Sequence, residues 1–296
     1  MNINVQNIIK DIIPVWNKDI TQYENHDLFP SHYRMLIFGS SEDGKTVLLN
    51  RLLLTKILDY EIIYIYSPSI LQPSYQIFIK GINNKLRLSH ILGLYDKQSQ
   101  IHDVDFAIKM ISEKLEKDNP KLEPIAKIIA SEFINDIPTP ENISKLAKIE
   151  AIETWKKYRD KKENEKFNIK IIVIIDDAIC YKQDKINKLF VYGRTYGINI
   201  IYLSQAFFET NKGQTRTNSN IFILFKQSES DLSMIYRRIC RNEISKDDFI
   251  NFFNKCWQKE RGFILIVKRS GKDAEYIDCE NLVNEIRKRQ IKLYSG

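Results

Sequence analysis

The chain has few Cys, Pro, Gly and His residues, the types that are abundant in disulfide-rich, collagen-like and zinc-binding proteins. Its 296 residues include only 4 Cys, 8 Pro, 10 Gly and 4 His. The cysteines, Cys180, Cys240, Cys256 and Cys279, are far apart and form no Cys-x-x-Cys pair, which argues against a zinc site and favours reduced thiols. No apolar run reaches the roughly 18 residues of a membrane span, and the N-terminus lacks the pattern of a signal peptide. We therefore expect a soluble, intracellular globular protein without a membrane segment.

Negative charge is also in short supply. Lys and Arg number 45 against 38 Asp and Glu, so the formal net charge is +7 and the pI is about 9.0. A modest positive field favours a polyanionic partner such as nucleic acid, although many basic proteins bind none. The composition, 43% hydrophobic and 28% charged, is close to that of an average soluble globular protein.

Apolar residues gather in short runs that are rich in β-branched and aromatic side chains and are separated by amphipathic segments. Such runs are typical of buried strands, and the segments between them are typical of helices. Strands alternating with helices predict a doubly wound α/β fold with a mostly parallel central sheet flanked by helices. The predicted strands lie within 32–39, 61–69, 168–178, 198–205, 220–227 and 262–268, and the main predicted helices within 46–60, 184–196, 230–240 and 246–257.

We divide the chain into three parts. Residues 1–30 mix apolar and polar positions and are expected to form an N-terminal packing arm. Residues 31–268 hold the α/β domain, within which residues 81–165 lose β-character, carry several prolines and are expected to form a helical insertion. Residues 269–296 end in a cluster of Lys and Arg and are expected to form a basic, solvated tail.

One segment fits the pattern G-x-x-x-x-G-K-[ST] of a phosphate-binding loop, between a predicted strand and a predicted helix. Its glycines allow the backbone to fold around phosphates, the Lys reaches the β and γ phosphates, and the hydroxyl holds Mg²⁺. The helix dipole also favours a bound anion. The candidate nucleotide-binding residues are Gly39, Ser40, Ser41, Glu42, Asp43, Gly44, Lys45, Thr46 and Val47.

Two acids inside this loop, Glu42 and Asp43, are unexpected next to a polyanion. The x positions contribute mainly backbone N–H groups, so we expect both side chains to point to solvent or to a neighbouring subunit. On this interpretation Lys45 and Mg²⁺ outweigh their charge.

Polar residues close two further predicted strands. Asp176 and Asp177 follow an apolar strand, where one carboxylate can coordinate Mg²⁺ and the second can orient or deprotonate water. Gln205 closes the next strand and could sense the γ-phosphate or position water, although a strand-end Gln can also simply bond a loop. Arg216 and Arg194 precede strands and are candidate arginine fingers, or else ordinary surface arginines.

The order "GSSEDGKT", "IIVIIDDA", "RTYGINIIYLSQ", "QTRTNSNIFILFKQ" resembles the FtsK/HerA superfamily of ring ATPases. The resemblance is strongest to the genome-packaging ATPases of poxviruses, other large DNA viruses and their virophages. It covers roughly residues 32–268, and it lies in the double Asp, the Arg-Thr-Tyr-Gly approach to a strand ending in Ser-Gln, and the Arg-x-Asn before the next strand.

This resemblance implies a RecA/ASCE-like P-loop ATPase in which the sensor strand lies between the P-loop strand and the Walker B strand. It also implies a homo-oligomeric ring that drives double-stranded DNA into a preformed capsid, with a capsid or portal component as a further partner. Such a protein acts in the host cytoplasm, in the viral factory, or in the virion. Carried over by position, Lys45 and Thr46 bind ATP phosphates and Mg²⁺, Asp176 holds the metal through water, Asp177 is the catalytic acid and Gln205 is the sensor.

The same resemblance makes Arg216 the preferred finger reaching a neighbouring subunit, with Arg194 second. Two alternatives share these motifs. One is a related DNA helicase or plasmid-transfer pump, and the other is a nucleotide-dependent assembly module that does not hydrolyse ATP.

Overall fold

The computed structural model describes most of the chain. The described residues are 28–117, 127–158, 169–178, 180–181, 183–205, 207, 214–240, 244–269 and 273–295. The expected N-terminal arm, residues 1–30, therefore lies almost entirely outside the described residues.

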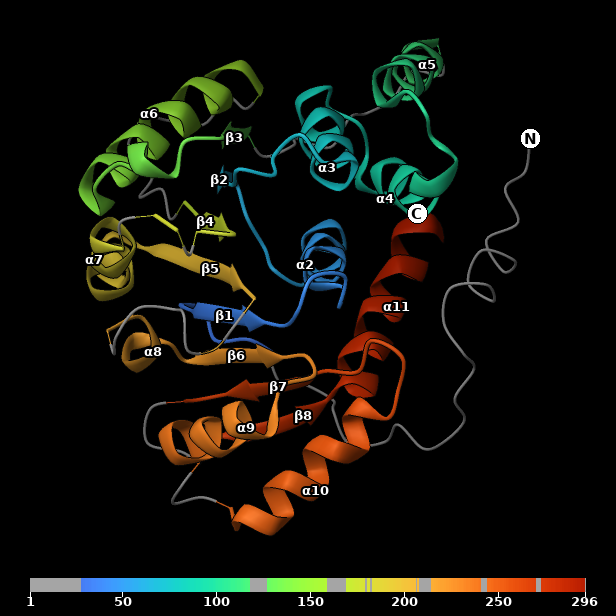
Figure 1. The fold of residues 1–296 in the computed structure, drawn as a ribbon. Coiled ribbons are helices and arrows are strands. Elements are labelled where there is room, and N and C mark those ends of the chain that lie inside the picture. The colour runs from blue at the N-terminus through green and yellow to red at the C-terminus, as the bar shows by residue number, and fades with distance from the viewer. Residues whose placement is uncertain are drawn as a thin grey trace.

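A single twisted sheet runs through the middle of the molecule (Figure 1). Within the described residues it has eight strands in the order β3-β2-β4-β5-β1-β6-β7-β8. Neighbouring strands pair in parallel from β3 to β6, whereas β7 is antiparallel to both β6 and β8. The strands are β1 (Arg34–Phe38), β2 (Ile62–Tyr66), β3 (Lys127–Ser131), β4 (Ile171–Asp176), β5 (Ile198–Ser204), β6 (Ile221–Leu224), β7 (Ile264–Val267) and β8 (Glu275–Asp278).

Helices cover both faces of this sheet, as Figure 1 shows. Core residues of α2, α3, α4, α5 and α11 pack on one face, and core residues of α6, α7, α9 and α10 pack on the other. The helices are α2 (Lys45–Leu54), α3 (Pro73–Asn83), α4 (Leu88–Asp96), α5 (Val104–Lys117), α6 (Pro140–Tyr158), α7 (Asp184–Tyr192), α8 (Gln214–Asn218), α9 (Glu229–Ile235), α10 (Lys246–Trp257) and α11 (Cys279–Ser295), with short turns at Gln98–Gln100, Ile134–Asp136, Gly193–Tyr196 and Tyr236–Cys240.

The period of two along each strand explains why two cores form. In β1, Met35 and Ile37 enter the core on the α2 face, whereas Leu36 and Phe38 enter the core on the α7 face. Strands buried on both faces must be apolar throughout, which is why "IIVIID" and "INIIYLS" could be recognised from sequence. The predicted α/β fold with a mostly parallel sheet is confirmed.

Residues 81–165 are not purely helical, contrary to the expectation from sequence. They supply α4, α5 and α6, but also β3, which pairs in parallel with β2 at the edge of the sheet. This strand is short and has one buried residue, Ile128, so it lacks the long apolar run by which the central strands were recognised.

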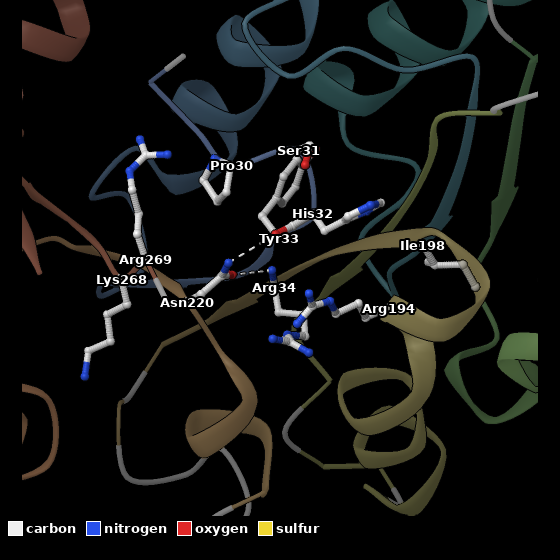
Figure 2. Close-up of a pocket in the computed structure, with 10 residues that line it drawn as sticks. All are labelled: Pro30, Ser31, His32, Tyr33, Arg34, Arg194, Ile198, Asn220, Lys268 and Arg269. Carbon is white, nitrogen blue, oxygen red and sulfur yellow. Dashed lines mark hydrogen bonds between the residues drawn. The ribbon is translucent and has the colours of Figure 1, made fainter. Parts of the chain in front are cut away.

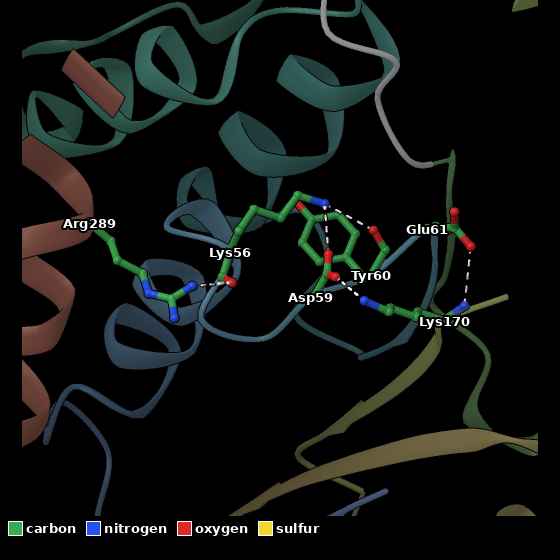
Figure 3. A network of polar contacts seen from close by, with 6 residues as sticks. All are labelled: Lys56, Asp59, Tyr60, Glu61, Lys170 and Arg289. Atoms are coloured by element: carbon green, nitrogen blue, oxygen red, sulfur yellow. Dashed lines mark hydrogen bonds and ion pairs between the residues drawn. The ribbon is translucent and has the colours of Figure 1, made fainter. Parts of the chain in front are cut away.

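The C-terminal segment is likewise not a solvated tail. Residues 275–278 form β8, and α11 packs its apolar side into the core through Leu282 and Ile286. Arg289 also donates a hydrogen bond to the carbonyl oxygen of Lys56 at 3.0 Å. Figure 3 shows that this bond joins α11 to the turn after α2, where Asp59 lies between Lys56 and Lys170. The basic residues of this segment thus belong to a docked amphipathic helix.

None of the helices in the described part of the chain has the length and apolar character that spanning a lipid bilayer requires.

Candidate nucleotide-binding site

The predicted phosphate-binding loop joins β1 to α2, and both of its glycines are required by its geometry. A Cβ atom at Gly39 would lie 2.7 Å from the Cβ of Phe225, which is too close for any other residue. Gly44 has a φ of 101°, a left-handed conformation that a side chain would strain. The loop is tied to β5, because the Gly39 N–H donates to the carbonyl oxygen of Ser204.

The Lys45 side chain folds back over the loop. Its ammonium donates to the carbonyl oxygens of Gly39 at 2.6 Å and of Ser40 at 2.7 Å. Burial lowers the pKa of Lys45, and three nearby carboxylates, led by Asp176, offset only part of that shift. The ammonium is thus held at the mouth of the loop, where it can move a short way to a phosphate.

The two acids of the loop differ in their placement. Glu42 is exposed and has a left-handed φ of 69°. Asp43 does not point away from the loop as expected, because its Oδ2 accepts a hydrogen bond from the Ser40 N–H at 2.5 Å. A short acid three residues after a backbone donor readily closes such a turn, so Asp43 helps to shape the loop.

A buried tyrosine that no sequence motif indicated joins the two predicted metal-binding residues. The Tyr75 hydroxyl, on α3, donates to Oδ2 of Asp176 at 2.6 Å and is also hydrogen-bonded to Thr46. Tyr75 is 0% exposed and Asp176 only 8% exposed. The start of α2, α3 and the end of β4 therefore converge on one hydroxyl group, although Tyr75 and Asp176 are far apart in sequence.

The electrostatic environment of Asp176 follows from this burial. Loss of hydration raises the pKa of the Asp176 carboxyl group, and the neighbouring charge of Asp177 raises it further. The Tyr75 hydrogen bond and the Lys45 ammonium act in the opposite direction but do not cancel the rise. The ionised carboxylate is therefore costly at this place, and its partners reduce that cost.

Asp177 and Gln205 lie next to each other, immediately after the neighbouring strands β4 and β5. Asp177 has a φ of 52°, a conformation that Asp tolerates better than most residues and that turns the chain sharply after β4. The amide nitrogen of Gln205 lies 3.5 Å from Oδ1 of Asp177, at the limit of a hydrogen bond. The two polar groups expected to handle water and the γ-phosphate are thus adjacent.

A cavity of about 430 Å³ brings most of the predicted residues together at the carboxyl edge of the parallel strands. Gly39, Ser40 and Asp43 do not line it. The residues expected from sequence that do line it are Ser41, Glu42, Gly44, Lys45, Thr46, Val47, Asp176, Asp177 and Gln205.

Arg261 lines the same cavity and was not predicted. It comes from the turn between α10 and β7, has a left-handed φ of 53° and is exposed. Its Cδ lies 3.6 Å from the position that a Cβ on Gly44 would occupy. No sequence motif indicates this role, because only the antiparallel return of β7 beside β6 brings Arg261 to the loop.

The two candidate arginine fingers lie outside this cavity. Arg216 donates to the carbonyl oxygen of Phe207 at 3.1 Å and stacks over its ring, 5.1 Å from the centroid. Phe207 in turn packs against Phe38, next to the loop. Arg194 lines a separate pocket with Arg34, at the amino end of β1 and thus at the opposite edge of the sheet. Neither arginine reaches its own subunit's nucleotide cavity.

The oxygen atoms at the cavity fit Mg²⁺ in kind. Thr46 offers a hydroxyl, and Asp176 offers a carboxylate that touches the same tyrosine. Within the described residues no group of three or more His, Cys, Asp or Glu could hold a metal ion. Mg²⁺ sites commonly take one or two protein ligands and complete their coordination with waters and substrate phosphates.

The sheet order identifies the class of protein. β5, which ends in Ser204 and Gln205, lies between the loop strand β1 and the acid strand β4, as expected of RecA/ASCE-like P-loop NTPases. The chain is a P-loop ATPase.

The family follows from comparison with known proteins. A family model described as "Poxvirus A32 protein" matches residues 20–121 and 123–291. The chain belongs to this family, and the resemblance to viral genome-packaging ATPases of the FtsK/HerA type is confirmed. No curated protein matches the chain.

Solved structures match the chain at low identity and with TM-scores below 0.5. The genome packaging NTPase B204 from Sulfolobus turreted icosahedral virus 2, in complex with ATP-gammaS, has a TM-score of 0.44 and 11% identity, covering 84% of this chain and 97% of that one. VirB4 of Thermoanaerobacter pseudethanolicus has a TM-score of 0.39 and 12% identity, covering 86% and 91%. Likenesses this remote do not carry residue roles over.

Proposed function

We propose that this packaging ATPase hydrolyses ATP to translocate double-stranded DNA, and that it works as a homo-oligomeric ring at a viral capsid or portal. The observation that carries the proposal is the meeting of Lys45, Thr46, Asp176, Asp177 and Gln205 around one cavity at the carboxyl edge of the sheet. Three separate segments of the chain supply these residues, so a chance loop match would not produce the arrangement. The net charge of +7 supports a DNA partner.

In the proposed reaction, loop N–H groups and Lys45 hold the ATP phosphates. Thr46 and Asp176 would hold Mg²⁺, which when bound neutralises charge on the β and γ phosphates. Asp177 orients a water molecule and accepts its proton as the water oxygen bonds to the γ-phosphorus. The bond from that phosphorus to the bridging oxygen breaks, and ADP and phosphate leave. Gln205, which lies beside Asp177, would sense the γ-phosphate.

Arg261 and Arg216 supply positive charge in different ways in this proposal. Arg261 lines its own subunit's cavity and would contact the nucleotide directly. Arg216 is held on the ring of Phe207, outside that cavity, and would reach the site of the adjacent subunit. An arginine finger of this kind adds about 10³ to 10⁵ in rate.

The first test measures ATP turnover with and without linear duplex DNA. We expect DNA to raise turnover, Lys45→Ala to abolish it, and Asp177→Asn to abolish it while nucleotide still binds. Lys148→Ala and Asp247→Asn, at exposed positions on α6 and α10, are the matched controls and should behave as wild type. Turnover that ignores DNA would contradict translocation, and full turnover in Asp177→Asn would contradict the role of that acid.

The second test asks whether Arg216 acts between subunits. Lys45→Ala subunits and Arg216→Ala subunits are each expected to be inactive, but a mixture forms some complete sites at subunit boundaries. In randomly mixed rings with equal amounts of each, roughly a quarter of the sites are complete, because each needs one particular neighbour. Recovery of turnover on mixing supports the trans finger, and its absence in verified mixed rings contradicts it.

A further inference from the structure

A second cavity lies at the amino edge of the parallel strands, away from the nucleotide site. Its volume is about 250 Å³. Arg34 begins β1, Ile198 begins β5 and Asn220 immediately precedes β6. Lys268 and Arg269 reach the same place because β7 runs in the opposite direction. Figure 2 shows these residues around the pocket, with Arg34 and Arg194 pointing toward one another.

The pocket concentrates positive charge with little compensation. The pKa of Arg34 is lowered by burial and by the charge of Arg194. Among the described residues, neither of these arginines forms an ion pair, whereas Arg269 pairs with Glu275 at 3.2 Å. The Lys268 ammonium donates to the carbonyl oxygen of Ile239 at 2.9 Å.

The backbone that carries Arg34 is held in place by two asparagines. The Arg34 N–H donates to Oδ1 of Asn220 at 2.8 Å, and the Asn220 amide donates to the carbonyl oxygen of His32 at 3.1 Å. The buried Asn199 accepts from the Tyr33 N–H at 2.9 Å. The like charges are therefore presented by a fixed scaffold, and such a scaffold can bind an anion with little reorganisation.

The shape of the charged region indicates a linear polyanion. Its cations come from β1, from the approach to β5, and from the end of β7, and these strands with β6 between them are adjacent in the sheet. Four adjacent strands span roughly 14 Å at about 4.8 Å per step. Guanidinium groups match phosphate oxygens in geometry and remain charged at all relevant pH values.

We propose that Arg34 and Arg194 form a clamp for a backbone phosphate of DNA. This inference rests on the proposed function and adds to it a DNA contact at the sheet edge opposite to the ATP cavity. It also gives Arg194 a role that its distance from the nucleotide site permits.

The test measures binding of a labelled DNA duplex over a range of salt concentrations, with a non-hydrolysable ATP analogue present. Arg34→Gln with Arg194→Gln should reduce the slope of log affinity against log salt by about 0.9 for each phosphate group that the variant no longer neutralises. For one phosphate this corresponds to a loss of affinity of roughly eightfold at 0.1 M salt. The control removes two exposed charges elsewhere, with Arg237→Gln and Lys148→Gln, and should keep the wild-type slope.

A second variant, with lysine at both positions, distinguishes loss of charge from disturbance of the fold. Arg34→Lys with Arg194→Lys keeps both charges and should retain nearly the wild-type slope, with weaker binding because the guanidinium fork is absent. A Gln pair that keeps the wild-type slope, or a Lys pair whose slope falls as far as that of the Gln pair, would overturn the clamp while leaving the proposed function intact. Wild-type protein that neither binds duplex nor responds to it in turnover would overturn both.

Discussion

Replacing Tyr75 by Phe tests whether the buried hydroxyl lowers the pKa of Asp176, the carboxylate proposed to bind Mg²⁺. The substitution removes one oxygen atom from a fully buried side chain, so packing changes little. It also removes a 2.6 Å hydrogen bond to Asp176 that lowers the pKa of that carboxyl group. Hydrogen bonds to charged groups contribute roughly 1.5 to 3 kcal/mol, which corresponds to about 1 to 2 pKa units.

The direction of the pH shift follows from the ionised form of Asp176 that Mg²⁺ binding requires. Asp176 must be ionised to hold Mg²⁺, so activity falls as the pH drops through its pKa. Burial already raises that pKa, and removal of the Tyr75 hydrogen bond raises it further. We therefore expect the acidic limb of kcat/KM against pH to move upward by about 1 to 2 units in Tyr75→Phe.

The assay is steady-state ATP turnover at fixed Mg²⁺ over a pH range in which thermal melting shows the fold to be intact. Tyr64→Phe is the matched control, because Tyr64 is also buried and its hydroxyl has no hydrogen-bond partner among the described residues. Its acidic limb should stay in place. An unmoved limb in Tyr75→Phe, with the control also unmoved, would refute the assignment of Tyr75 as a positioning residue for Asp176.

Two further predictions concern residues that only the structure identified. Arg261→Gln should raise the KM for ATP about tenfold or more, as for removal of a charge-assisted hydrogen bond of roughly 1.5 kcal/mol, whereas Arg237→Gln should leave KM unchanged in the same turnover assay. Leu282→Ala should lower the free energy of unfolding by about 2 to 5 kcal/mol in urea titrations, and Lys288→Ala by less than about 0.5. An unaltered KM, or equal stability of the two α11 variants, would contradict the respective interpretation.

The central strands could be predicted because a strand buried on both faces is a continuous run of apolar residues in the sequence. Each is a short apolar run, and the loop after β1, the acids at the end of β4 and Gln205 after β5 meet at one edge of the sheet. A β-branched run and its terminal side chains lie within a few residues of one another. The strands and their terminal side chains can therefore be predicted from the local sequence, without knowledge of the fold.

Edge strands, and residues that only folding brings together, show no such local pattern in the sequence. β3 and β8 are short and partly exposed, so their residues satisfy no strict period. Tyr75 belongs to an amphipathic helix, and only its hydroxyl distinguishes it from a core aromatic residue. Arg261 lies in a turn rich in charge. Their roles depend on which segments fold together, and that information is distributed over the whole chain.

The pairing of β5 on both sides has a mechanical consequence. β5 is hydrogen-bonded along its length to β1 and to β4, so sliding it would break two ladders at once. The centre of the sheet is therefore expected to resist sliding of one strand past another. Under the proposed function, a movement coupled to loss of the γ-phosphate would therefore start at Asp177 and Gln205, which follow these strands, and not within the strands themselves.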